Sequence, residues 1–237
     1  MEKHKYLSKV KIEEYAYEFL SDNSPDSLNK SIQTDIEYII ENKLNINLQY
    51  LKLDTTNNLL GMTIMNPMKV KYIDENLQIV EGIFDRNTIL INEFLAIEKN
   101  QEHRLYFTLA HEIGHWYLQR KDAYVDSGQQ SLFGSDSIKS NVNRYIDNID
   151  IFQKLKSKRL VTEEDWLEWQ ANYFASCILM PKGTFTNEYL KLDGKNVLEK
   201  AKILSEIFNV SEEAAAYRMK DIKSGLDKQS ESLFKQI

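Results

Sequence analysis

The run His111-Glu112-Ile113-Gly114-His115 places two imidazoles and a carboxylate within five residues. On a helix, residues four apart share a face with β-carbons about 5 to 6 Å apart, a gap that one zinc ion bridges through Zn–N bonds of roughly 2.0 to 2.1 Å. Glu112 lies about 100° further round the helix, so it reaches water beside the metal rather than the metal itself. The pattern therefore predicts half of a zinc hydrolase site, with Glu112 as the catalytic base.

A hydrolytic zinc site usually has three protein ligands, so the two histidines need a partner from elsewhere in the chain. His103 lies roughly 12 Å from His111 along the same expected helix, and His4 lies near a terminus, so neither is a good third ligand. A carboxylate is left. Glu168 is the best candidate, because small residues share its stripe of a second expected helix and would let the two helices approach closely. Asn172, one turn beyond, is expected to orient a ligand histidine. The alternatives are a solvated carboxylate at 168 and a packing amide at 172.

The elements that must position these residues follow from apolar spacing. Helical periodicity predicts helices at residues 11–20 and 31–43, and the motif helix at 101–119. Short apolar runs separated by turn residues predict a small, largely antiparallel sheet, with a hairpin turn at Asp85-Arg86-Asn87. The strands are expected at 48–53, 59–65, 70–73, 77–84 and 88–91.

The chain beyond the motif helix changes character. Frequent Ser, Asp, Asn and Gln without a persistent period predict an insertion at about residues 120–160. A helix is expected from Thr162, which can cap it together with Asp165, to about residue 179. Two further helices are expected within residues 195–222, with Ser211 as a cap between them, and the polar tail after Gly225 is expected to fray.

Composition limits the classes of function. The 237 residues carry a net charge of −6 from 36 acidic and 30 basic residues, which argues against direct nucleic-acid binding and against an acidic membrane surface. No apolar run approaches the roughly 18 residues of a membrane span, and the N-terminus lacks the apolar region of a leader. The single cysteine, Cys177, excludes an intramolecular disulfide and a multi-cysteine zinc cage. It is expected to be a buried small hydrophobe, and we expect a cytoplasmic protein.

Two blocks of sequence extend the motif into a longer pattern. Residues 104–115 read RLYFTLAHEIGH, and residues 168–175 read EWQANYFA and lead into Leu179-Met180-Pro181. Together they resemble the ImmA/IrrE family of zinc metallopeptidases. The segment 208–211, leading to Arg218, also looks like the family's C-terminal end. The resemblance covers about residues 30 to 220 and implies an α+β, zincin-like metallopeptidase fold.

The resemblance also implies roles for residues. It implies Zn²⁺ as cofactor, His111, His115 and Glu168 as its ligands, and Glu112 as the catalytic carboxylate. We expect an N-terminal helical segment at 1–30, the metallopeptidase domain at 31–190 and a C-terminal helical region at 191–237. A family strand corresponds to residues 88–92, and we expect it to be an edge strand that holds an extended substrate through main-chain hydrogen bonds. Its residues are Thr88, Ile89, Leu90, Ile91 and Asn92.

Family members typically cleave a partner repressor with a helix-turn-helix, which implies a zinc endopeptidase of narrow specificity acting on such a protein. The oxyanion donor stays open among Tyr124, Tyr145 and Tyr173. One alternative is a DNA-binding regulator with residues 197–222 as its helix-turn-helix, but residues 211–220 balance acidic against basic side chains where phosphate contacts favour positive charge. Another is a non-catalytic protein that sequesters the repressor. The oligomeric state is not predicted.

Overall fold

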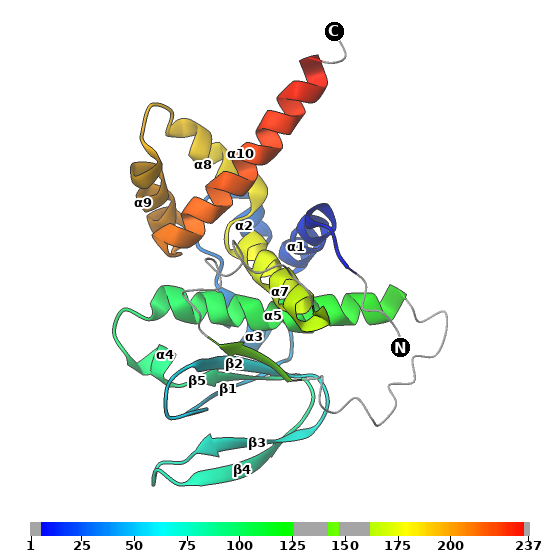
Figure 1. Ribbon diagram of the computed structural model, residues 1–237, viewed down its shortest axis with the longest axis vertical. Coiled ribbons are helices and arrows are strands. Elements are labelled where there is room, and N and C mark those ends of the chain that lie inside the picture. The colour runs from blue at the N-terminus through cyan, green and yellow to red at the C-terminus, as the bar shows by residue number, and fades with distance from the viewer. Residues whose placement is uncertain (1–5, 126–141, 147–161, 235–237) are drawn as a thin grey trace. The chain divides into compact units, whose positions relative to one another are not determined.

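The structure is a computed structural model that describes residues 6–125, 142–146 and 162–234 (Figure 1). The chain packs as two compact units. Unit 1 comprises residues 1–12 and 36–175, and unit 2 comprises residues 13–35 and 176–237. Within the described ranges helices outnumber strands, and the strands form small sheets, which is consistent with the predicted α+β class. No helix among the described residues is both long and apolar enough to cross a membrane.

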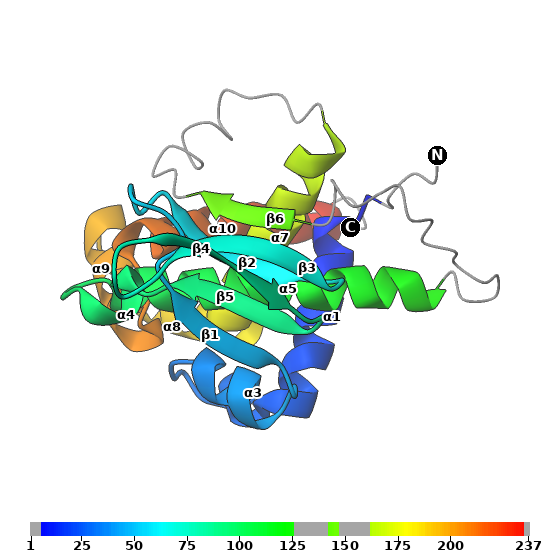
Figure 2. The same ribbon diagram turned by 90° about the horizontal axis from the view of Figure 1, so that it is seen from below.

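The main sheet of unit 1 has the strand order β1-β5-β2-β6 (Figure 2). Its strands are β1 (Asn47–Leu51), β2 (Leu59–Ile64), β5 (Thr88–Asn92) and β6 (Val142–Ile146). β5 pairs parallel with β1 and antiparallel with β2, and β2 also pairs antiparallel with β6. The sheet is therefore mixed rather than largely antiparallel, and a continuous apolar run such as β5 is typical of a strand buried on both faces.

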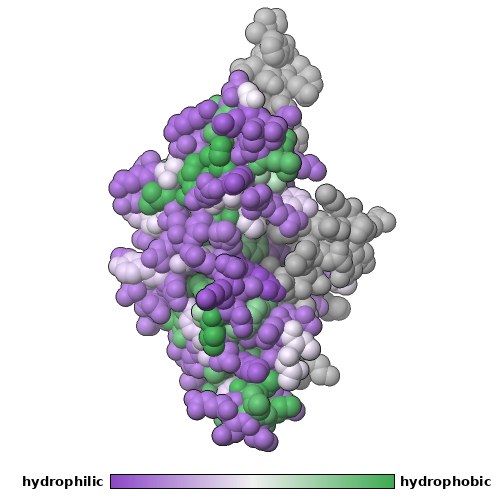
Figure 3. Space-filling view, turned by 90° about the vertical axis from the view of Figure 1, so that its left-hand side faces the viewer, coloured by the Kyte–Doolittle hydropathy of each residue, from purple (hydrophilic) through white to green (hydrophobic). Residues whose placement is uncertain are grey.

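A second, two-stranded sheet consists of β3 (Met68–Ile73) and β4 (Ile79–Phe84). One face packs against β2, where Val70 and Phe84 join a buried apolar cluster. The other face leaves Ile79 and Ile83 about three-quarters exposed, and apolar atoms gather at this lower end of the molecule in Figure 3. The predicted hairpin turn at Asp85-Arg86-Asn87 is wrong, because it connects β4 to β5 and those strands lie in different sheets.

The helices of unit 1 are α3 (Ile36–Asn42), α4 (Phe94–Ile97), α5 (Glu102–Val125) and α7 (Glu163–Leu179) as far as Ala175. α3 is shorter than predicted because residues 31–35 are not helical, and α5 extends beyond the predicted end at residue 119. The predicted cap of α7 is confirmed, since the Thr162 hydroxyl accepts from the Asp165 backbone N–H and the Asp165 carboxylate accepts from the Thr162 N–H, each at 3.0 Å.

Unit 2 is helical. It contains the C-terminal part of α1 (Lys9–Asn23), then α2 (Pro25–Asn29), α8 (Lys182–Lys191), α9 (Val197–Phe208) and α10 (Glu212–Phe234). The two helices predicted within residues 195–222 are α9 and α10, and Ser211 caps α10 as expected. α8 was not predicted, and α10 continues past Gly225, where fraying was expected. Cys177 is buried, as predicted, and burial raises the pKa of its thiol.

The predicted insertion at residues 120–160 contains one described strand. β6 falls within it and pairs with β2, which no sequence pattern indicated. Residues 126–141 and 147–161 of this predicted insertion lie outside the described residues.

Candidate metal centre

Close approach of two helices brings the predicted ligands together. A β-carbon added to Gly114 of α5 would lie 2.9 Å from the carbonyl oxygen of Ala171 in α7 and 3.0 Å from its Cα. Such distances leave no room for a side chain at position 114, so glycine lets the two backbones nearly touch. The predicted approach through small residues is confirmed, and it places the ligand-bearing faces of α5 and α7 against each other.

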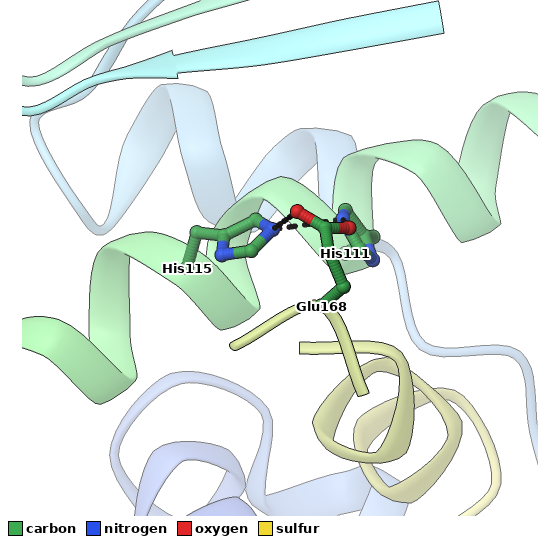
Figure 4. A group of neighbouring side chains, drawn as sticks. All are labelled: His111, His115 and Glu168. Carbon is green, nitrogen blue, oxygen red and sulfur yellow. Dashed lines mark hydrogen bonds and ion pairs between the residues drawn. The ribbon is translucent and has the colours of Figure 1, made fainter. Parts of the chain in front are cut away.

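Three side chains converge between these helices (Figure 4). The Nε2 atoms of His111 and His115 lie 2.9 Å apart. Each of the two Glu168 carboxylate oxygens faces one imidazole, at 3.3 Å from Nε2 of His111 and 3.2 Å from Nε2 of His115. Candidate ligand atoms of all three residues lie within 4.8 Å of one another.

These distances fit a zinc ion. Tetrahedral ligands at about 2.05 Å from a metal are roughly 3.3 Å from one another, close to the carboxylate–imidazole distances here. Two neutral imidazole lone pairs as close as those of His111 and His115 repel each other unless a proton or a cation lies between them. Two nitrogens and one carboxylate oxygen also match the protein donor set of hydrolytic zinc sites, which leave a fourth position open. The residues present therefore suit a metal.

Asn172 lies where it was predicted to act on a ligand histidine. Its Oδ1 lies 3.0 Å from Nδ1 of His111, and both side chains are buried. Because an amide oxygen only accepts, Nδ1 of His111 carries a proton and donates it, so Nε2 is the ring nitrogen that faces Glu168 and His115 and that a metal would take. The contact selects the tautomer that a metal ligand needs.

The Glu168 carboxylate is held in its charged form. Burial alone would raise its pKa, but the imidazoles of His115 and His111, through charge and hydrogen bonding, lower that pKa well below its ordinary value. The side chain is one-quarter exposed, whereas those of the two histidines are fully buried. The centre thus has a fully buried imidazole side and a partly exposed carboxylate side.

Glu112 is buried beside this centre. Burial is the main cause that raises the pKa of its carboxyl from 4.5 to about 8, against the lowering effects of His111 and of a hydrogen bond from Thr63. Its Oε1 has no hydrogen-bond partner among the described residues. A buried carboxyl with a pKa near neutrality and one unpaired oxygen is suited to accept and return a proton.

The prediction that residues 88–92 form an edge strand is wrong. β5 is an inner strand, because β1 occupies one of its edges and β2 the other along most of its length, and all five of its residues, Thr88, Ile89, Leu90, Ile91 and Asn92, are buried. Its main chain is therefore committed to the sheet and cannot hold a substrate. Of the three tyrosines considered as oxyanion donors, Tyr173 stacks on Trp169, with ring centroids 5.6 Å apart. The side chains of Tyr124 and Tyr145 lie outside the described residues.

Two residues that touch Glu112 were missed from the sequence. They are Gly61 and Thr63 of β2, about fifty residues earlier in the chain. An isolated glycine within a predicted strand is a recognised sign of close backbone approach, so Gly61 carried a usable signal. A threonine in a strand is ordinary, and Thr63 carried none.

A pair of histidines and a carboxylate on two helices, next to a buried carboxylate, is the set of groups used by metal-dependent hydrolases. Residues 154–220 match the peptidase family M78, described as the IrrE N-terminal-like domain, and this confirms the resemblance predicted from the sequence. The matched segment contains Glu168 and Asn172 of α7. It also contains all of α8 and α9 and ends within α10. No curated protein matches the chain. The family indicates a metallopeptidase.

Proposed function

We propose that this protein is a zinc-dependent endopeptidase of narrow specificity with a zincin-like site in unit 1. The observation that carries the proposal is the convergence of His111, His115 and Glu168, with candidate ligand atoms within 4.8 Å of one another. The buried carboxyl of Glu112 beside them supports peptide hydrolysis rather than a purely structural metal site, because structural sites need no neighbouring base. A cytoplasmic location is part of the proposal and is favoured by the single, buried cysteine.

The chemistry that a bound zinc ion supplies is a pKa of water lowered toward about 7 and a polarised scissile carbonyl. Glu112 accepts a proton from the attacking water and passes it to the leaving amine, a transfer that its raised pKa allows in both directions near neutral pH. Asn172 keeps the Nδ1 proton on His111 throughout, so that its Nε2 stays a ligand. Glu168 contributes a negative charge that offsets the cation.

The proposed substrate is a partner repressor with a helix-turn-helix. Support comes from the resemblance to a family whose members cleave such repressors. The net charge of −6 also disfavours the alternative in which this protein itself binds DNA. In this proposal the protein acts on transcription through another protein, without binding nucleic acid or a membrane.

The test combines metal binding with cleavage. The full chain is stripped with a chelator, titrated with zinc against a chromophoric competitor, and incubated with helix-turn-helix repressors from the same genome. We expect one zinc ion per chain. We also expect cleavage of the repressor at one position, which mass spectrometry of the products identifies. Glu112→Gln should bind zinc as the wild type does and lose cleavage, since the amide cannot accept the proton. Glu164→Gln, at an exposed carboxylate in the first turn of α7, should keep both.

The same experiment separates the alternatives. Zinc binding and repressor binding without cleavage would indicate sequestration. DNA binding by the chain itself, with an affinity that falls steeply with salt, would indicate a DNA-binding regulator. Cleavage that persists in Glu112→Gln would refute the proposed catalytic role.

A further inference from the structure

β2 has two faces with different partners. Met62 and Ile64 belong to the buried apolar cluster shared with β3 and β4. Because side chains alternate along a strand, Gly61 and Thr63 lie on the opposite face, and both are in contact with Glu112 of α5. The strand therefore presents two successive same-face positions to the proposed catalytic base.

Thr63 holds one oxygen of the Glu112 carboxylate. Its hydroxyl, fully buried, lies 2.6 Å from Oε2 and 3.0 Å from the main-chain oxygen of the same residue. A hydroxyl has one proton to donate, and a carboxylate oxygen is a stronger acceptor than a main-chain oxygen. The Thr63 hydroxyl therefore donates to Oε2, the closer of the two. This hydrogen bond restrains the orientation of the Glu112 carboxyl group.

Gly61 makes room for the other oxygen. A β-carbon at this position would lie 2.8 Å from Oε1 of Glu112 and 2.9 Å from the methyl carbon of Thr108. Both neighbours are side-chain atoms, so the first group that a larger residue would displace is the carboxylate itself. Oε1 has no hydrogen-bond partner among the described residues, which leaves it available for the proton of the reaction.

We propose that Thr63 and Gly61 are positioning residues for Glu112: the Thr63 hydroxyl anchors Oε2, and the missing side chain of Gly61 leaves the space in which Oε1 meets the attacking water. The inference rests on the proposed function, in which Glu112 is the proton acceptor. β2 then supports catalysis without touching the substrate.

The test uses the full chain with zinc bound and the repressor that the wild type cleaves. Thr63→Val removes the hydroxyl at nearly constant volume, and we expect kcat to fall roughly 10- to 100-fold, as for loss of a hydrogen bond to a charged group, with KM changed less than about twofold. Thr63→Ser keeps the hydroxyl and should retain kcat within about threefold. Gly61→Ala should lower kcat with zinc affinity unchanged.

A matched control is Thr34→Val. Thr34 is also fully buried and its hydroxyl donates to a carbonyl, that of Ile178 in unit 2, so the change removes a comparable hydrogen bond far from Glu112 in sequence. It should cost similar stability and leave kcat unchanged. If Thr63→Val lowers kcat no more than Thr34→Val does, or if Thr63→Ser fails to rescue, the proposal is overturned.

A readout independent of cleavage keeps the two proposals distinguishable. In protein labelled with ¹³C at the glutamate carboxyl carbons, the Glu112 resonance is the one lost in Glu112→Gln. We expect Thr63→Val to shift this resonance at fixed pH with zinc bound, and Thr34→Val to leave it in place. If the wild type cleaves no repressor, the proposed function fails, and the Glu112 resonance alone decides whether Thr63 orients Glu112. If Thr63→Val leaves this resonance in place, the proposed orienting role of Thr63 is refuted.

Discussion

Replacing Gly114 with alanine tests whether close helix packing is what assembles the metal centre. The new β-carbon would lie 2.9 Å from the carbonyl oxygen of Ala171, whereas ordinary contact begins at 3.4 Å. The opposing atoms belong to a helix backbone and cannot turn aside as a flexible side chain does. α5 and α7 must therefore separate by about 0.5 Å at this point.

The expected magnitude differs between folding and metal binding. Overpacking costs about 1 to 3 kcal/mol and the better helix propensity of alanine returns about 1 kcal/mol, so the metal-free protein should lose about 0 to 2 kcal/mol of unfolding free energy. Metal–ligand distances tolerate only about 0.2 Å, so moving Glu168 away from the two histidines should weaken zinc binding more severely. We expect a loss of about 10- to 100-fold, as when contacts that orient a ligand are removed.

The assay pairs competitive zinc titration with urea denaturation of the chelated protein. Gly225→Ala is the matched control, because a β-carbon at this position of α10 meets nothing within 4 Å. It should stabilise the protein by about 0.5 to 1 kcal/mol and leave zinc affinity unchanged. If Gly114→Ala binds zinc as tightly as the wild type, the distance between α5 and α7 does not control the centre and the reasoning fails.

Three further predictions follow from other contacts. Asn172→Ala should lower zinc affinity about 10- to 100-fold in the same titration, because His111 loses the partner of its Nδ1 proton; unchanged affinity would contradict that role. In metal-free protein, burial raises the pKa of Glu112 to about 8, so the folded state keeps a proton that the unfolded state loses above about pH 4.5, and stability should fall as pH rises toward 8. Denaturation at several pH values should show the unfolding free energy of Glu112→Gln rising relative to that of the wild type across this range. Parallel pH profiles of the two proteins would contradict the raised pKa of Glu112. In unit 2, Arg218→Met should cost about 3 to 5 kcal/mol in urea denaturation, because it leaves Glu13 without its two guanidinium contacts of 2.7 and 3.2 Å. Lys69→Met removes a solvent-exposed ion pair with Glu81 and should leave the urea midpoint unchanged.

The histidine half of the metal centre was predictable because its information is local. His111 and His115 are one turn apart, so their common face follows from helix geometry alone. The cap formed by Thr162 and Asp165 marks the start of α7, the helix that carries Glu168, but the assignment of Glu168 as third ligand came from the family resemblance. Whether these ligands bind zinc stays a prediction.

The sheet was less predictable because strand partners are chosen over long sequence distances. The apolar runs located five strands within a few residues, but no pattern stated that β5 would be paired on both sides, and so its assignment as an edge strand was wrong. β6 arises from a polar stretch with no period of its own. Thr63 meets Glu112 only because β2 lies against α5, a tertiary relation that spacing along the chain does not encode.

The pairing of β6 with β2 has a consequence for synthesis of the chain. The ribosome completes β2 before α5, and β6 only afterwards, so for that interval the side of β2 away from β5 presents unpaired N–H and C=O groups. An open strand edge can pair with an extended segment of another chain until its own partner is available. We therefore expect strand exchange between neighbouring nascent copies to be possible while this edge of β2 is unpaired, and pairing with residues 142–146 ends that period.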